Sequence, residues 1–489
     1  MSATPSGHQY PSHIMLLGIR QVTYGLSSLR GSERIFELFL AFPNMPIPSF
    51  NSVRSWMYRL GLYLTQAAQE QRDDWLFILD HTMKLGQQKC LLILGVTEEQ
   101  LRTKGYALQH QDVTVLAMEV VTTSTGELVK EQIEKVSKKV GTPLQILSDH
   151  GSDLKKGVQL YQTENPTVVY TYDITHKMAA LVKAELHTDE RWNSFAQECG
   201  QARTSLKQTN LQFLLPPRQR TKARYSNIAP RIEWGEKVLA YRQQGDYEQI
   251  NPTFTLDQQT IQAVEKEVGF NAASSLSVAI KAGKPKTYAS QETFTEAVVA
   301  LVGDEQIEAV KAVIYPAAAQ GQRQFEQKLG WVGEYKEDLE IYAQMNQLVM
   351  MAEEQVKQNG LNRQSSQTFE DNIASMNLHS RTQTLGKKIS RYLREEGEQI
   401  PSEQTLLGTS DVIESIFGKY KYISSESPLR DLGKMLLTIP VLTTELTCEL
   451  VKTAMETVPA LAVDKWADEL LGKSSLSKRR MLSAALEVT

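Results

Sequence analysis

The chain has 489 residues, of which 41% are apolar and 22% charged, a composition that excludes wholesale disorder and predicts three or four globular domains. Its three cysteines lie far apart and form no CxxC pair, which argues against a disulfide framework or a cysteine zinc site. The formal net charge of −4 means that any nucleic-acid binding must rest on local basic patches. Because no signal core and no apolar run of about 18 residues occurs, we expect a soluble, cytoplasmic protein without a membrane partner.

The spacing of apolar residues within 1–70 predicts a domain of short helices. One helix begins near Ser49, carries apolar residues at helical spacing on one face, and can end at Gly61. The opposite face offers candidate DNA contacts, namely Arg54, Tyr58 and Arg59. Two helices with such a face are typical of a helix-turn-helix DNA reader, but a small helical bundle with a solvated basic face explains these residues equally well.

Residues 71–190 alternate between strand-length apolar runs and helical patterns. The expected strands are 75–79, 89–96, 113–121, 143–148 and 167–172, and the expected helices are 127–140, 153–162 and 174–187. Short links permit hairpins between the first three strands, whereas the later strands alternate with helices and need parallel crossovers. This order predicts a mixed sheet with helices on its faces.

Acidic residues mark two of the expected strand ends. Asp80 follows the run 75–79, and Asp149 follows the run 144–148. If the first and fourth strands pair, the two carboxylates lie close together and need a divalent cation between them. Each acid by itself is more often an ordinary solvated residue. Asp153, four residues after Asp149, has its own simple explanation, because an acid in the first turn of a helix is favoured by the helix dipole.

A short motif follows the fifth strand. Asp173 can cap the next helix, and His176 lies in the first turn of that helix. A lone histidine is more often a structural hydrogen-bonding residue than a catalyst, but one beside a metal site can touch a phosphate or orient a carboxylate.

The stretch 191–400 contains many helical patterns and few strand-like runs, which predicts an all-helical insertion. Between 203 and 232 the chain has basic residues and no Asp or Glu, a run that favours phosphate contacts. Its basic residues are Arg203, Lys207, Arg218, Arg220, Lys222, Arg224 and Arg231. Trp234 follows and is more often a core residue than a base-stacking one. A helix within 401–430 carries Glu414, and 431–489 is a helical segment with a basic tail.

In this order, Asp80, Asp149, the Asp-x-x-His motif at 173–176, a helical interruption and Glu414 resemble the DDE transposases of the ribonuclease-H-like superfamily. The chain is most similar to bacterial insertion-sequence transposases with a helical insertion. Lys421 follows Glu414 at the spacing of one such group, although Leu407 and Ser410 depart from that group's signature, and Lys419 is an equal candidate for a DNA contact.

The resemblance implies that residues 71–190 and 401–430 form one ribonuclease-H-like catalytic core. It implies that Asp80, Asp149 and Glu414 bind two Mg²⁺ or Mn²⁺ ions and that His176 supports them. The expected activity is strand cleavage at transposon ends followed by 3′-hydroxyl transfer into target DNA, by a homodimer or higher oligomer associated with the bacterial nucleoid. Two alternatives stay open, a nuclease or resolvase without strand transfer, and a domesticated, non-catalytic DNA-binding protein.

Overall fold

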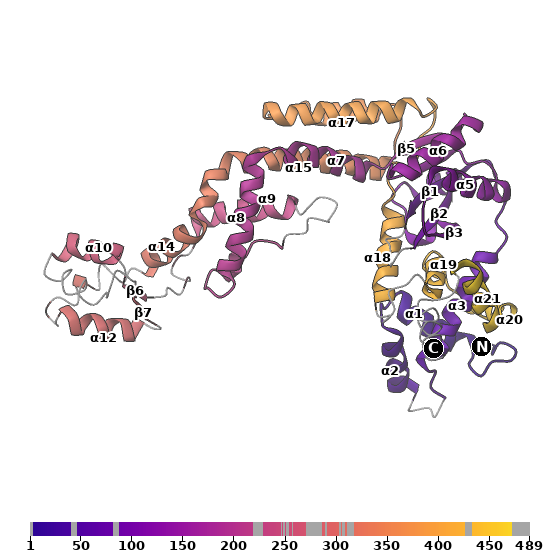
Figure 1. The fold of residues 1–489 in the computed structure, drawn as a ribbon, viewed down its shortest axis with the longest axis horizontal. Coiled ribbons are helices and arrows are strands. Elements are labelled where there is room, and N and C mark those ends of the chain that lie inside the picture. Colours follow the sequence, from indigo (N-terminus) through magenta and orange to yellow (C-terminus); the bar gives the residue numbers. More distant parts are fainter. Residues whose placement is uncertain are drawn as a thin grey trace, which may run out of the picture. The chain divides into compact units, whose positions relative to one another are not determined.

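The computed structural model describes residues 3–40, 46–81, 88–218, 228–245, 247, 250, 254–256, 258–269, 286–288, 291–302, 305, 309–310, 317–425 and 433–471. The chain forms two compact units (Figure 1). The first, called the sheet unit here, comprises Met1–Ala180, Val349–Met376 and Gly386–Thr489. The second unit comprises Leu181–Leu348 and Asn377–Leu385.

A five-stranded mixed sheet lies at the centre of the sheet unit. Its strands are β1 (Trp75–His81), β2 (Lys89–Thr97), β3 (Thr114–Val121), β4 (Gln145–Ser148) and β5 (Val169–Tyr172). The order across the sheet is β3-β2-β1-β4-β5, with antiparallel pairs among β1, β2 and β3 and parallel pairs from β1 to β4 and β4 to β5. The mixed sheet and the pairing of the first and fourth strands are confirmed.

Helices cover both faces of the sheet because nearly every β1 side chain is apolar and buried. Phe77 and Leu79 pack with one face of α5 (Gly126–Val140) and of α6 (Ser152–Glu164) in a single apolar cluster. The alternate residues Leu76 and Ile78 are also buried. On the sheet, α18 (Asp411–Ser425) contacts β1, and α19 (Thr438–Leu442) contacts β3.

The N-terminal helices belong to the sheet unit. They are α1 (Ser12–Thr23), α2 (Leu29–Leu40) and α3 (Phe50–Gln66). They pack against η7 (Lys434–Leu437), α20 (Cys448–Thr457) and α21 (Ala460–Leu471). The prediction that Gly61 ends its helix is wrong, because α3 continues to Gln66. A Cβ at Gly61 would lie 1.9 Å from the Leu437 carbonyl oxygen, so glycine is needed for this close approach.

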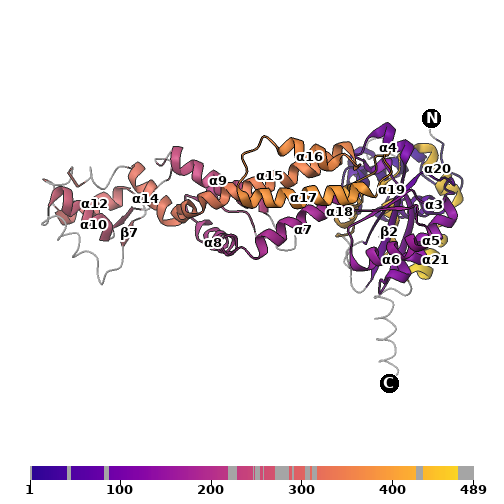
Figure 2. The ribbon, with the colours of Figure 1, turned by 90° about the horizontal axis from the view of Figure 1, so that it is seen from above.

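The sheet unit contains further helices. They are α4 (Glu98–Lys104), η1 (His110–Asp112), α16 (Ser365–Ile373) and parts of α7 (Ile174–His187), α15 (Lys336–Asn359) and α17 (Ser380–Glu398). Figure 2 shows α16 beside α17, where the Ser366 and Ser390 hydroxyls lie 2.9 Å apart. No helix in the described part of the chain is long and apolar enough to cross a membrane.

The second unit is mainly helical, but the prediction that 191–400 is all-helical is wrong. Its helices are α8 (Glu190–Leu206), η2 (Gln212–Leu214), α9 (Ile228–Gln244), α10 (Gln258–Val268), α12 (Gln291–Val302), α14 (Ala317–Leu329) and η6 (Gly330–Tyr335). The short strands β6 (Phe254–Leu256) and β7 (Lys286–Tyr288) form an antiparallel pair. Buried Leu256 joins Phe294 and Val298 in a small apolar core, which explains why a three-residue strand is stable there.

Candidate functional site

The register of the sheet brings Asp80 and Asp149 to the same edge. Leu79 and Ser148 are the last paired residues of the parallel strands β1 and β4, and the two aspartates follow them directly. Since neighbouring strands run about 4.8 Å apart, the two carboxylates start from adjacent positions. Asp80 Oδ1 accepts a hydrogen bond from the His81 backbone N at 2.6 Å. The predicted proximity of these acids therefore follows from the strand pairing.

The loop after β4 holds Asp149 in place. His150 has a left-handed φ of 55°, a conformation that costs a non-glycine residue about 1–2 kcal/mol. The His150 ring stacks on Tyr172 with a centroid distance of 4.2 Å, which offsets part of that cost. This turn lets the Gly151 backbone N donate to Asp149 Oδ1 at 2.8 Å. Burial lowers the pKa of His150 to about 4, so its ring is neutral at pH 7.

Gly151 lies close to two carboxylates. A Cβ at this position would lie 3.2 Å from Asp149 Oδ1 and 3.4 Å from Asp153 Oδ1. Asp153 Oδ2 lies 3.9 Å from His81 Nε2 and 3.9 Å from Lys89 Nζ. As predicted, Asp153 lies in the first turn of α6, but it also belongs to this polar cluster. Sequence reasoning missed His81, although it directly follows Asp80.

Asp173 is a fully buried carboxylate that joins two helices. Its Oδ1 accepts from the His176 backbone N at 2.7 Å, which confirms the predicted helix cap, and lies 3.0 Å from His176 Nδ1. Its Oδ2 accepts from the backbone N and the hydroxyl of Ser410, at 2.5 and 2.8 Å. Burial by itself would raise the pKa of Asp173, but the hydrogen bonds from His176 and Ser410 outweigh it and lower the pKa.

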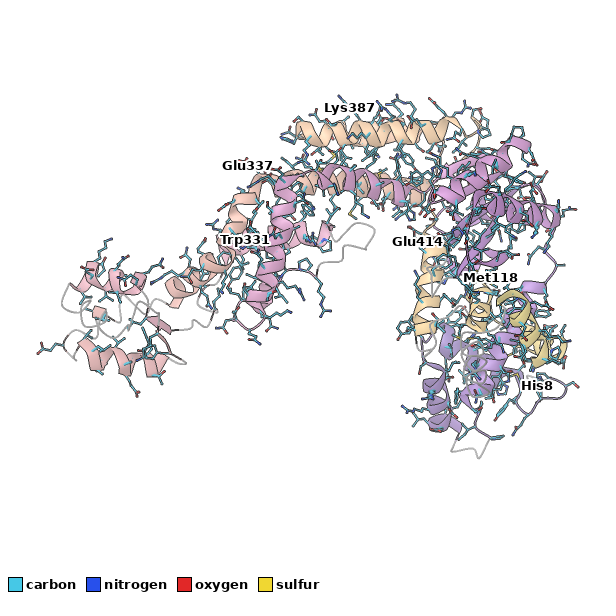
Figure 3. All side chains as sticks on the ribbon, in the orientation of Figure 1. His8, Met118, Trp331, Glu337, Lys387 and Glu414 are labelled. Carbon is cyan, nitrogen blue, oxygen red and sulfur yellow. The ribbon has the colours of Figure 1, made fainter. Side chains whose placement is uncertain are left out.

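The chain returns to the sheet immediately before α18. Gln145 of β4 donates to the Leu407 carbonyl at 2.7 Å and accepts from the Leu407 backbone N at 3.1 Å. With the bonds from Asp173 to Ser410, these contacts fix the start of α18 against β4 and β5. Glu414 lies in the first turn of α18 (Figure 3), and its Oε1 is 3.7 Å from His176 Nδ1. His176 therefore connects Glu414 with Asp173.

Two sets of contacts place the predicted ligands. Asp80 and Asp149 lie at neighbouring strand ends, and Glu414 lies beside His176. Across the described residues, no three side chains of His, Cys, Asp and Glu are arranged to hold one metal ion. The Asp80 and Asp149 carboxylates, at adjacent strand ends, fit a hard divalent cation by their donor chemistry.

Two of the predicted DNA contacts on α3 face other helices. The Tyr58 hydroxyl lies 2.9 Å from Met435 Sδ, and the Arg59 guanidinium donates to the backbone carbonyls of Met455 and Val458. The prediction that both belong to an open DNA-reading face is therefore wrong, because C-terminal helices cover that side. Arg54 is exposed, as predicted.

In the basic run of the second unit, only part of the prediction falls on described residues. Arg218 is exposed, whereas Arg220, Lys222 and Arg224 lie outside the residues that the structure describes. Arg231 is buried and stacks over Trp192, and burial lowers its pKa, so the prediction of a phosphate contact there is wrong. Trp234 is also buried and donates to the Leu214 carbonyl at 2.8 Å, which confirms its interpretation as a core residue.

The two lysines of α18 differ in surroundings. Lys421 is exposed, and Lys419 is half-buried. Lys419 lies near His110, whose pKa is lowered mainly by burial and further by this neighbouring cation. Lys421 is therefore the more accessible of the two.

Searches against models of known protein families and against curated proteins found no match to this chain.

Proposed function

We propose that the chain is a DNA transposase of the DDE type, with a ribonuclease-H-like core and an inserted, mainly helical unit. The observation that carries this proposal is the register of β1 and β4, since Leu79 pairs with Ser148 and Asp80 and Asp149 follow at adjacent positions. Two neighbouring carboxylates at the ends of buried strands contribute little to an apolar core, and they repel each other unless a cation lies between them. Their position therefore suits a site for a hard cation.

The segment before α18 supports the assignment of Glu414 to the same site. Gln145 and Asp173 each bond to it at two atoms, so a residue far along the chain starts its helix beside β4 and β5. His176 lies 3.7 Å from Glu414 and can orient its carboxylate. Glu414 would complete the ligand set of the aspartate pair when DNA and metal bind.

Asp80 and Asp149 would hold one Mg²⁺ or Mn²⁺ ion, and Glu414 would contribute to a second. When bound, such ions lower the pKa of a water or 3′-hydroxyl and neutralise charge on the leaving oxygen. The protein positions the carboxylates through the Asp149 turn and the Asp173 bonds. Arg54, Arg218 and Lys421 are the predicted DNA contacts that stay exposed, and joining two DNA ends requires a dimer or higher assembly.

The proposal is tested by incubating the purified chain with Mg²⁺ and DNA that carries the sequences flanking its coding region. Strand nicks and joined products resolved on a sequencing gel are the expected result. Asp149→Asn and Asp80→Asn should each slow cleavage by at least about 100-fold, because each removes a ligand charge. Asp468→Asn, on an exposed face of α21, is the matched control and should cleave normally.

Undiminished cleavage by Asp149→Ala would contradict the proposed site. Nicks without joined products would instead favour a nuclease or resolvase. Specific DNA binding without metal-dependent cleavage would favour a non-catalytic DNA-binding protein.

A further inference from the structure

Two tyrosines of the edge strand β5 lie against the loop that follows Asp149. Tyr170 and Tyr172 are alternate residues of this strand, so their side chains leave the same face of the sheet. The His150 ring contacts both of them, with centroid distances of 4.6 Å to Tyr170 and 4.2 Å to Tyr172, and it lies nearly parallel to the Tyr172 ring, at 7°. The residue next to Asp149 is thus packed on two side chains of another strand.

These ring contacts stabilise a backbone conformation that histidine does not favour. His150 has a φ of 55°, in the left-handed region. Two aromatic pairs contribute a free energy of the same order as the cost of this conformation to a non-glycine residue. Within the turn, the Gly151 backbone N donates to Asp149 Oδ1 at 2.8 Å. Without the ring contacts, His150 would return to an ordinary conformation, and the bond that orients the Asp149 carboxylate would be lost.

Both tyrosines are themselves fixed by hydrogen bonds. The Tyr170 hydroxyl lies 2.8 Å from the Ser148 hydroxyl. The Tyr392 hydroxyl of α17 donates to the Tyr172 carbonyl at 2.6 Å, and the Tyr172 backbone N donates to Glu396 Oε2 of α17 at 2.9 Å. Side chains of α17 therefore satisfy both backbone groups of Tyr172, which sets the position from which its ring supports His150.

We propose that Tyr172 is a positioning residue for cation binding, because through the His150 ring it fixes the turn that orients the Asp149 carboxylate. Replacing a residue that orients a metal ligand typically lowers metal affinity by about 10–100-fold. The inference rests on the proposed function for the role of Asp149 as a ligand. It also extends that function, since it assigns a role in the site to β5 and, through the bonds to Tyr172, to α17.

The test compares full-length Tyr172→Leu, which removes the ring, with Tyr172→Phe, which keeps it. Binding of Mn²⁺ without DNA is followed by the electron paramagnetic resonance signal of the free ion, and Asp149→Asn identifies the site. Hydrogen–deuterium exchange of the peptide covering residues 148–152 reports on the turn. The matched control is Tyr241→Leu, which removes another half-buried tyrosine with aromatic neighbours, in the second unit.

Tyr172→Leu should bind Mn²⁺ about 10-fold more weakly and should exchange the 148–152 peptide about 10-fold faster, whereas Tyr172→Phe and Tyr241→Leu should match the wild type. His150→Gly should weaken binding to a similar degree, because glycine permits the turn but has no ring that holds it. The double variant Tyr172→Leu/His150→Gly should lose no more affinity than either single variant, because both changes remove the same ring contact.

Equal Mn²⁺ affinities of Tyr172→Leu and the wild type would overturn the inference even if exchange became faster, since Tyr172 would then support the fold alone. Additive losses in the double variant would also overturn it. A wild type that binds Mn²⁺ no better than Asp149→Asn would remove both the inference and the cation site of the proposed function. Because Mn²⁺ binding is measured without DNA, the expected order of affinities in a chain that does not cleave DNA would defeat only the proposed function.

Discussion

Asp173→Asn tests whether a single buried carboxylate holds the Glu414 helix to the sheet. Asp173 is fully buried, and its Oδ2 accepts two hydrogen bonds from Ser410. In the asparagine variant, Oδ1 can still accept from His176, but an amide nitrogen faces the Ser410 backbone N. Leaving that buried donor without an acceptor costs about 1–3 kcal/mol. The start of α18 should therefore open more often than in the wild type.

Hydrogen–deuterium exchange measures this opening locally. A loss of about 2 kcal/mol should speed exchange of the peptide covering residues 407–414 about 30-fold, while peptides from α5 stay unchanged. Ser410→Ala removes only the hydroxyl bond, which is worth about 1 kcal/mol, and should speed exchange about fivefold. Equal exchange of this peptide in Asp173→Asn and the wild type would refute the tether.

The pH dependence of the tether has a defined sign. The pKa of Asp173 lies below its ordinary value of 3.8, because hydrogen bonds from His176 and Ser410 outweigh burial. The unfolded chain then binds the proton more readily than the folded one. The tether is thus complete at neutral pH, and its contribution falls as the pH drops below 3.8 towards the lower pKa of the folded state.

Two further predictions concern stability. Burial raises the pKa of Glu396 from 4.5 to about 7, partly offset by the hydrogen bond from the Tyr172 backbone N, so the folded state retains a proton that the unfolded chain releases. In urea unfolding, the free energy of unfolding should fall by about 3 kcal/mol from pH 4.5 to 7, and Glu396→Gln should abolish this pH dependence. If the pH dependence persists in the variant, Glu396 is not its cause. Gly61→Ala should cost at least about 1–3 kcal/mol, because its Cβ would overlap the Leu437 carbonyl, whereas Gly418→Ala, with nothing within 4 Å, should stabilise by about 0.5–1 kcal/mol. Equal urea midpoints for the two alanine variants would contradict the close approach.

Much of the sheet could be predicted because its strands are short, nearly continuous apolar runs. Hairpin-length links and helical crossovers restrict the order of such strands to few arrangements. The adjacency of Asp80 and Asp149 then follows from one pairing, that of β1 with β4. The Asp173 cap and the buried Trp234 were predictable for a similar reason, since both depend on neighbours within about twenty residues.

Predictions about polar helix faces succeeded less often. Periodicity identifies which side of a helix is apolar, but it does not tell what covers the other side. Arg59 bonds to carbonyls almost four hundred residues away, and Arg231 is buried among aromatic side chains of its unit. The tertiary structure also showed that the inner face of α17 is occupied by contacts with β5 and α16.

The sequence by itself determined the strands, their expected partners in the sheet and the two acids at adjacent strand ends, because these depend on local hydrophobic patterns and short connections. Only the tertiary structure decided where Glu414 lies. Its helix is placed by the bonds of Gln145 to Leu407 and of Asp173 to Ser410, contacts that join residues more than two hundred positions apart. No local pattern encodes such contacts, because their free energy comes from satisfying buried polar groups that meet only after the chain has folded.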